Sequence, residues 1–137
     1  MDCIFCKIVS GNIPSRKIHE TPNSLAFLDA FPLVRGHILV IPKRHYTTIQ
    51  EMTQDDNSDL FETVRVVTKK AECLAPSSLV AVHNGRESGQ EIPHVHVHII
   101  PRREGDGAGP VHSMFTNRPK LDEGEFAKIV EILARQV

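Results

Sequence analysis

Three histidines alternate with apolar residues in the segment Pro93–Ile100, which reads PHVHVHII. Side chains of a β-strand point alternately to opposite faces, so an extended segment would present His94, His96 and His98 on one face, about 7 Å apart. The valines and Ile99 would point the other way, toward a core. Because an uncommitted surface strand rarely presents three titratable rings in a row, we expect the chemistry on this face.

Two cysteines near the start of the chain, Cys3 and Cys6, have a spacing that suits tetrahedral zinc. At helical positions i and i+3, both sulfurs would lie on one side of a helix. A closed structural zinc site with two cysteines also needs two histidines, and His45 and His94 are the candidates. The alternative is that the cysteines are small apolar side chains that fill an N-terminal helix.

The middle histidine, His96, suits nucleophilic chemistry, because a neutral imidazole attacks phosphorus or an acyl carbon and forms labile adducts. It would need one ring nitrogen held by an acceptor, and hydrogen-bond donors around the charge that develops. Donors are available in the side chains of Asn84, Gln90 and His98. A catalytic zinc held by all three histidines fits the same spacing equally well.

The elements that position these residues follow from hydrophobic periodicity and turn residues. Helices are expected over 3–9, from residue 53 to Pro76, and around 126–133. Strands are expected over 17–20, 24–29, 37–41, 78–83 and 93–100. The last two strands would form a hairpin whose polar loop lies beside the histidine face, and Cys73 would be a buried filler on the long helix. This order predicts an α+β fold with a mostly antiparallel sheet.

Length and charge narrow the class of protein. The 137 residues fit one domain, and the net charge of −1 without a basic run argues against a nucleic-acid binder. No apolar stretch approaches the roughly 20 residues that span a bilayer, and the N-terminus lacks a signal-peptide pattern. We therefore expect a cytoplasmic protein with no membrane partner, in which the cysteines are reduced.

The histidine segment resembles the motif of the histidine triad (HIT) superfamily, His-φ-His-φ-His-φ-φ with a preceding Gly-Gln. Further resemblance to Hint and Fhit proteins lies in Cys3–Ile8, Ile13–Pro14, Phe27–Asp29, Gly36–His45 and Pro101–Asp106. The chain is identified as a member of this superfamily, of the Hint or the Fhit branch. The resemblance implies a five-stranded HIT-like fold in a single domain over residues 1–137, with a core over about 3–101 and a C-terminal extension over 102–137.

The resemblance also implies an enzyme. It would be a nucleotide hydrolase or transferase that cleaves at the α-phosphate of a nucleoside, with adenosine as the expected nucleoside. The substrate would be a nucleoside phosphoramidate or a dinucleoside polyphosphate, and the intermediate a nucleotidyl-histidine. Relatives of this kind are homodimers. The alternative from another class is a nucleotide-binding or partner-binding module with little turnover.

Residue roles follow from the same resemblance. His96 would be the nucleophile, while His98 and His37 would bind and polarise the phosphate. Asp29 would hold the ribose, and Asn84 and Gln90 would contact phosphate or ribose. The base pocket would be lined by Phe5, Ile8, Ile13 and Phe27. The ligands of a structural zinc would be Cys3, Cys6, His45 and His94.

Simpler interpretations exist for several of these residues. The apolar ones could be core, Asp29 could be only a turn cap, and His37 could be a core histidine. His83, His19 and His112 match no motif position.

Glu91 departs from the family pattern, because Hint and Fhit proteins usually carry Ser or Thr directly after the Gly-Gln. An ionised carboxylate cannot donate a hydrogen bond to a leaving group and would repel a phosphate. It could accept a hydrogen bond from an amine, or act as an acid if its pKa is raised. We therefore expect Glu91 at the leaving-group end of the site, with a preference away from polyphosphates.

Overall fold

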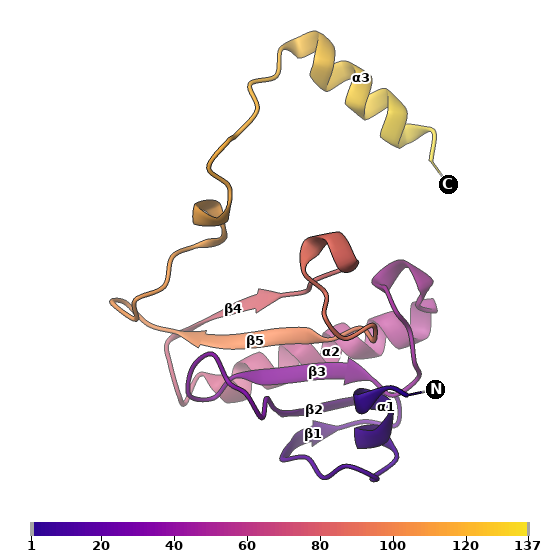
Figure 1. Ribbon diagram of the computed structural model, residues 1–137, viewed down its shortest axis with the longest axis vertical. Helices are drawn as coiled ribbons and strands as arrows, with labels where there is room; N and C mark the ends of the chain where they lie inside the picture. The colour runs from indigo at the N-terminus through magenta and orange to yellow at the C-terminus, as the bar shows by residue number, and fades with distance from the viewer. Residues whose placement is uncertain (1, 137) are drawn as a thin grey trace. The chain divides into compact units, whose positions relative to one another are not determined.

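The computed structural model describes residues 2–136, and Figure 1 shows a single sheet with α1 (Ile4–Val9) and α2 (Gln54–Ala71) packed against it. The five strands are β1 (Lys17–Glu20), β2 (Ser24–Leu28), β3 (Ile38–Pro42), β4 (Ser77–Ala81) and β5 (Val97–Arg102). Their order in the sheet is β1-β2-β3-β5-β4, and all neighbouring pairs are antiparallel. Helix α3 spans Glu123–Ala134, and the 3-10 turns are η1 (Ile49–Glu51), η2 (Arg86–Ser88) and η3 (Val111–Met114). The predicted α+β fold is confirmed.

The chain divides into two compact units, one up to Asp106 and one from Gly107 onward. The sheet, α1 and α2 belong to the first unit. The second unit contains η3 and α3, and α3 begins with a capping box between Asp122 and Glu125. The single domain over 1–137, with its core and extension, stays a prediction. Within residues 2–136, no helix combines the length and the apolar character needed to cross a membrane.

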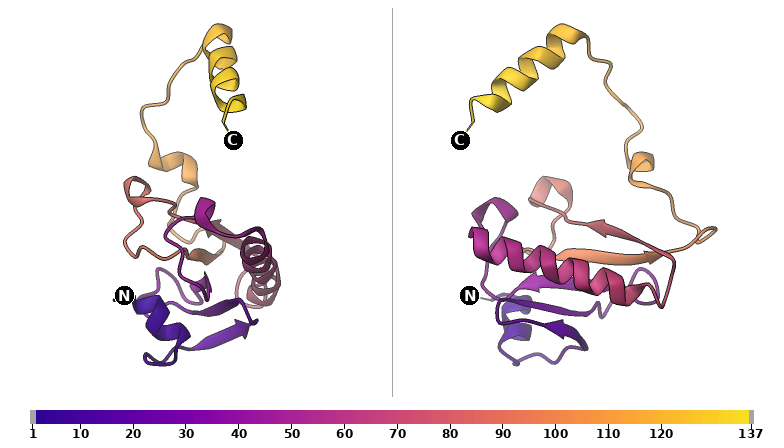
Figure 2. Two further views of the ribbon diagram at one scale, coloured as in Figure 1. Left: turned by 90° about the vertical axis from the view of Figure 1, so that its right-hand side faces the viewer. Right: turned by 180° about the vertical axis from the view of Figure 1, so that it is seen from behind.

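Helices α1 and α2 cover opposite faces of the sheet (Figure 2). On the α2 face, Leu60 and Val67 of the helix pack against Val40 and Ile99 of the two central strands. On the α1 face, the helix contributes its own apolar side chains to a second cluster with β2 and β3. This second cluster comprises Cys3, Phe5, Ile8, Leu25, Phe27, Leu39 and Ile41. Alternate positions of β2 and β3 therefore belong to different clusters, as strand alternation requires.

Hydrogen bonds between nearby residues determine where α2 begins and ends. The Thr53 side chain accepts a hydrogen bond from the Asp56 amide at 3.2 Å, which caps the start of the helix. The helix was expected to run on to Pro76, but it ends at Ala71. Its last backbone bonds change to i→i−3 spacing, as in the 2.9 Å bond from the Leu74 amide to the Ala71 carbonyl. Cys73 lies in this turn and is exposed, so the expectation that it fills the core was wrong.

The histidine segment pairs as a strand later than expected. Strand β5 begins at Val97 rather than at Pro93, because the backbone before it bonds elsewhere. The Val95 amide donates to the Tyr46 carbonyl at 2.8 Å instead of to a neighbouring strand. The alternation of faces is still kept. Val95, Val97 and Ile99 are buried in the α2-side core, so the histidines between them face the α1 side.

Candidate functional site

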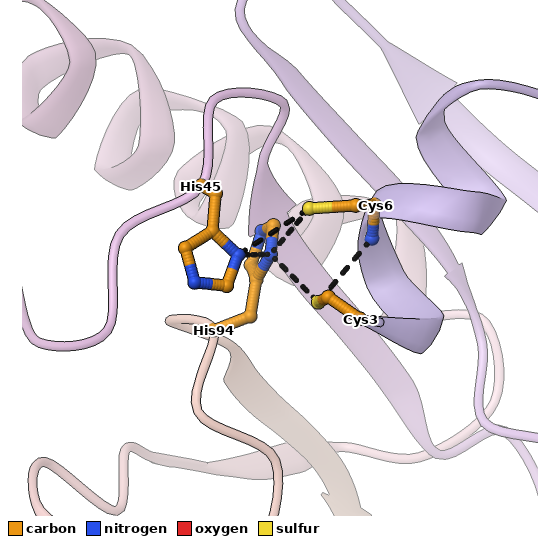
Figure 3. Close-up of side chains that lie close together, drawn as sticks. All are labelled: Cys3, Cys6, His45 and His94. Atoms are coloured by element: carbon orange, nitrogen blue, oxygen red, sulfur yellow. Dashed lines mark hydrogen bonds between the residues drawn. The ribbon is translucent and has the colours of Figure 1, made fainter. Parts of the chain in front are cut away.

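Cys3, Cys6, His45 and His94 form a cluster whose possible ligand atoms all lie within 4.8 Å of one another (Figure 3). Three elements supply these residues, namely the start of α1, the loop after β3 and the segment before β5. The Nδ1 atom of His94 lies 3.4 Å from the Cys3 sulfur and 3.6 Å from the Cys6 sulfur. The Nδ1 atom of His45 lies 3.3 Å from the Cys6 sulfur and 3.2 Å from Nδ1 of His94. The four predicted ligands therefore converge on one point.

This cluster fits a tetrahedral zinc ion. Around zinc with ordinary bond lengths, sulfur–nitrogen and nitrogen–nitrogen separations would be about 3.6 and 3.3 Å. His94 donates its Nε2 proton to the Pro42 carbonyl at 2.9 Å, so the lone pair on Nδ1 faces the cysteines. Burial lowers the pKa of His94 to about 4, which keeps the ring neutral as a ligand must be. Burial and the neighbouring Cys3 raise the pKa of the Cys6 thiol, and a divalent cation would supply the missing positive charge.

His96 is held by the backbone of His94. Its Nδ1 atom lies 2.8 Å from the His94 carbonyl oxygen, and only a protonated Nδ1 can donate to that acceptor. Burial lowers the pKa of His96, so the ring is neutral and the lone pair lies on Nε2. The Phe5 ring packs edge-on against the imidazole with 5.1 Å between centroids. His96 thus has the protonation and orientation that a nitrogen nucleophile needs.

A chain of hydrogen bonds sets the tautomer of His98. The Leu33 amide donates to Nδ1 of His37 at 3.1 Å, so the proton of the neutral His37 ring is on Nε2. That Nε2 donates to Nδ1 of His98 at 2.9 Å, which places the His98 proton on Nε2. Burial lowers the pKa values of both rings, that of His98 to about 4. Nε2 of His98 is buried and has no partner among the described residues, so it is a free donor beside His96.

Asp29 is a turn cap and also a cavity residue. One carboxylate oxygen accepts a hydrogen bond from the Phe31 amide at 2.9 Å. The other lies 3.7 Å from Nδ1 of His37. Asp29, His37 and His98 are the second group in residues 2–136 that could hold a metal, but the two histidines use facing nitrogens in their mutual hydrogen bond. Neither group contains all three triad histidines, which disfavours the zinc-on-triad alternative.

A cavity of about 440 Å³ opens above these histidines, within the range of small-ligand sites. It lies between α1, the end of β2 and the loop before β5. Among the residues predicted to bind nucleotide or act in catalysis, those in its wall are Phe5, Ile8, Ile13, Phe27, Asp29, Glu91, His96 and His98. The wall of the cavity combines apolar side chains with the polar groups of His96, His98 and Asp29. Phe5, Ile8 and Phe27 are also buried core residues, so the core interpretation of them is correct, and their contact with a base stays a prediction.

Asn84 and Gln90 are not among the residues that line this cavity. The Asn84 side chain accepts from the Ile49 amide at 2.8 Å and donates to Gln50. Gln90 accepts from the Gly85 amide and donates to the Thr47 carbonyl, both within 2.8 Å. In this structure the two amides hold loops together, and their contact with phosphate or ribose stays a prediction.

One histidine of the cavity wall matches no motif position. His83 follows β4, lines the cavity, and places its ring 5.5 Å from that of His98. The hairpin register contains the signal that locates it. Ala81 pairs with His98, so His83, two residues further along, lies on the same face and toward His96.

The antiparallel sheet of this α+β fold places a neutral histidine, His96, in the wall of a partly apolar cavity, as expected for a protein of the histidine triad class. The HIT domain family model matches residues 10–105. A protein from Schizosaccharomyces pombe named adenosine 5'-monophosphoramidase is 47% identical over 103 residues, covering 74% of this chain and 75% of that protein. An Arabidopsis thaliana protein named adenylylsulfatase is 36% identical over 138 residues, covering 99% of this chain and 70% of that protein.

Similar solved structures indicate the same family as these relatives. A HIT family protein from Bacillus subtilis superposes with a TM-score of 0.89 at 33% identity, covering 100% of this chain and 98% of that one. A zinc-bound histidine triad family protein from Mycobacterium smegmatis superposes with a TM-score of 0.75 at 30% identity, covering 99% of both chains. The chain belongs to the HIT family, which confirms the resemblance drawn from its motifs.

Proposed function

We propose that this chain is a hydrolase or transferase of nucleotides that works through a nucleotidyl-His96 intermediate. The observation that supports it most directly is the hydrogen bond from Nδ1 of His96 to the His94 carbonyl. It leaves Nε2 of a neutral ring available in the wall of the cavity. Relatives whose names denote hydrolysis of adenosine monophosphoramidate and adenylylsulfate support hydrolysis at an α-phosphate.

The reaction has two displacements at phosphorus. In the first, Nε2 of His96 attacks the α-phosphorus, and the bond from phosphorus to the leaving nitrogen or oxygen breaks. In the second, water attacks the adduct, releases the nucleoside monophosphate and restores neutral His96. The Nε2 proton of His98 would hydrogen-bond a non-bridging phosphate oxygen in both steps. Asp29 would hold the ribose, and the apolar wall would hold the base, with adenine as the expected base.

The test uses adenosine monophosphoramidate with wild type and His96→Ala. Wild type should release adenosine monophosphate. Rapid quenching in alkaline denaturant, which preserves the phosphorus–nitrogen bond, should allow mass spectrometry to detect an adenylyl group on His96. His96→Ala should lose both signals while still binding the nucleotide. Equally slow turnover by wild type and variant would contradict the enzyme and favour the alternative, a binding module with little turnover.

Zinc is the metal we propose for the cluster of Cys3, Cys6, His45 and His94. Its role would be structural, because four protein ligands leave no position for substrate. The zinc-bound relative from Mycobacterium smegmatis supports this assignment. Bound zinc would fix the His94 ring, and the His94 carbonyl in turn holds His96. The zinc site would thereby position the nucleophile from outside the cavity.

Glu91 supports a preference for phosphoramidates over dinucleoside polyphosphates. Its exposed side chain lines the cavity that also contains His96. A carboxylate there would accept a hydrogen bond from a leaving amine and repel a leaving polyphosphate.

We also propose a cytoplasmic homodimer. The cytoplasm would keep the paired cysteines reduced for metal binding. Strand β4 is an edge of the sheet with Val80 exposed, and an unpaired edge can join a second copy. Light scattering of the purified chain would measure the mass, and a monomeric mass would contradict the dimer.

A further inference from the structure

His83 differs from the other histidines of the site, because no hydrogen bond within the described residues sets its tautomer. His37, His94, His96 and His98 each use a ring nitrogen in a hydrogen bond. Within residues 2–136, no hydrogen bond joins either ring nitrogen of His83 to another residue, and the ring is only half-buried. Both nitrogens of His83 are therefore available to form hydrogen bonds with solvent or with a ligand in the cavity.

The surroundings of His83 nevertheless hold the ring in place. Its edge meets the His98 ring at 74° with 5.5 Å between centroids. On another side lies the backbone of Gly89, where an added Cβ would stand 3.4 Å from Cδ2 of His83. Gly89 has a φ of +107°, so the backbone conformation disfavours a side chain at this position. The ring is packed at one edge and open to the cavity at the other.

The leaving-group end of the site needs a proton donor. An amine cannot depart from phosphorus as an anion, so the nitrogen must be protonated as its bond breaks. Glu91 lines the same cavity, and a carboxylate can donate no proton when it is ionised. Nδ1 of His98 accepts the hydrogen bond from His37, and its one proton, on Nε2, is assigned to the phosphate in the proposed function. His83 is the remaining titratable ring in the cavity wall.

We propose that His83 is the general acid and base of the reaction, an inference that rests on the proposed function. In the first step, the His83 imidazolium gives its proton to the leaving nitrogen while Nε2 of His96 bonds to phosphorus. The products are free amine, neutral His83 and the positively charged adenylyl-His96. In the second step, neutral His83 takes a proton from the attacking water. The hydroxide forms the new bond to phosphorus, and neutral His96 departs.

Two substrates test this role, because only one of them has a leaving group that must be protonated. An alkylamide of adenosine monophosphate needs a proton on its leaving group, whereas the p-nitrophenyl ester releases a stable anion. His83→Gln and His83→Asn should reduce turnover of the alkylamide by about 10²- to 10⁴-fold. Turnover of the ester through adenylyl-His96 should fall by less than about threefold where formation of the adduct limits the rate. Burst kinetics on the ester measures that first step directly.

His19→Gln is the matched control, because His19 lies on β1 and outside the cavity wall. It should leave both reactions at the wild-type rate. Circular dichroism checks that each variant is folded, and His83→Asn provides a second variant if His83→Gln is not. An equal loss on both substrates, or no loss on either, would overturn the role of His83 alone. A wild type that releases no nitrophenolate in a His96-dependent way would overturn the proposed function and this inference together.

Discussion

The Nε2 atom of His37 lies 2.9 Å from Nδ1 of His98, and this contact determines which nitrogen of His98 carries the proton. The two residues belong to neighbouring segments of the sheet, His37 just before β3 and His98 within β5. His37 does not line the cavity, so its part in the reaction would be indirect. Because His37 is itself oriented by the Leu33 amide, a loop outside the sheet controls a donor inside the site.

Replacing His37 by phenylalanine should separate this indirect role from packing. His37→Phe keeps a ring but removes the donor to His98, so the His98 proton should distribute over both nitrogens. We expect kcat to fall about 10- to 100-fold with little change in KM. Nitrogen NMR of the histidine rings should show a single Nε2-protonated His98 in wild type and a mixture in the variant. His19→Phe is the control, and an unchanged kcat in His37→Phe would contradict the role.

Much of this site could be predicted from the sequence, because it depends on local periodicity. Alternation within PHVHVHII places the three rings on one face whether or not the backbone pairs with a neighbour. Ligand chemistry and the family pattern predicted that Cys3, Cys6, His45 and His94 would lie together, as they do in the structure. Both predictions could be made without knowing which distant segments contact each other.

What the sequence did not reveal depends on long-range bonds. The late start of β5 follows from the bond between Val95 and Tyr46, which lie far apart in the chain. The loop-holding bonds of Asn84 and Gln90 likewise use distant backbone groups. His83 was overlooked because it matches no motif, although the hairpin register would have placed it beside His96.

Stability should fall in mild acid because of His98. Its pKa in the folded chain is about 4, mainly through burial, against 6.5 for an ordinary histidine. Between these values the unfolded chain binds a proton that the folded chain does not bind, so the free energy of unfolding decreases as the pH falls from 6.5 toward 4. The contribution of this one ring is up to about 3 kcal/mol.

Urea unfolding of wild type and His98→Asn across this pH window measures the effect. The variant lacks the depressed histidine, so its stability should depend less steeply on pH. Comparing the two at the same zinc concentration removes the separate pH dependence of metal binding. Parallel curves for the two proteins would show that His98 is not the group responsible.

Metal content should depend on Cys6 and not on Cys73. We expect one zinc per chain in wild type and in Cys73→Ser, since Cys73 is exposed and outside the cluster. Cys6→Ser should lose the zinc, unfold at a lower temperature and turn over more slowly, because His94 would no longer be held. Elemental analysis and thermal unfolding with and without chelator provide the readouts. Zinc retained by Cys6→Ser would instead indicate ligation by the triad histidines.

Glu91 should set the preference of the site for its leaving group. Glu91→Ser removes a negative charge from the cavity wall and restores the hydroxyl that Hint and Fhit proteins usually carry at this position. Turnover of a diadenosine polyphosphate should rise relative to that of adenosine monophosphoramidate by about three- to tenfold at low salt, and the gain should shrink as salt screens the charge.

Glu87→Ser is the matched control for this charge. Glu87 is an exposed carboxylate of the same loop and is not part of the cavity wall. If the effect of Glu91 were only a change in net charge, both variants would shift the substrate ratio equally. If it depends on position, only Glu91→Ser should shift it. A wild type that already hydrolyses the polyphosphate faster than the phosphoramidate would remove the proposed preference altogether.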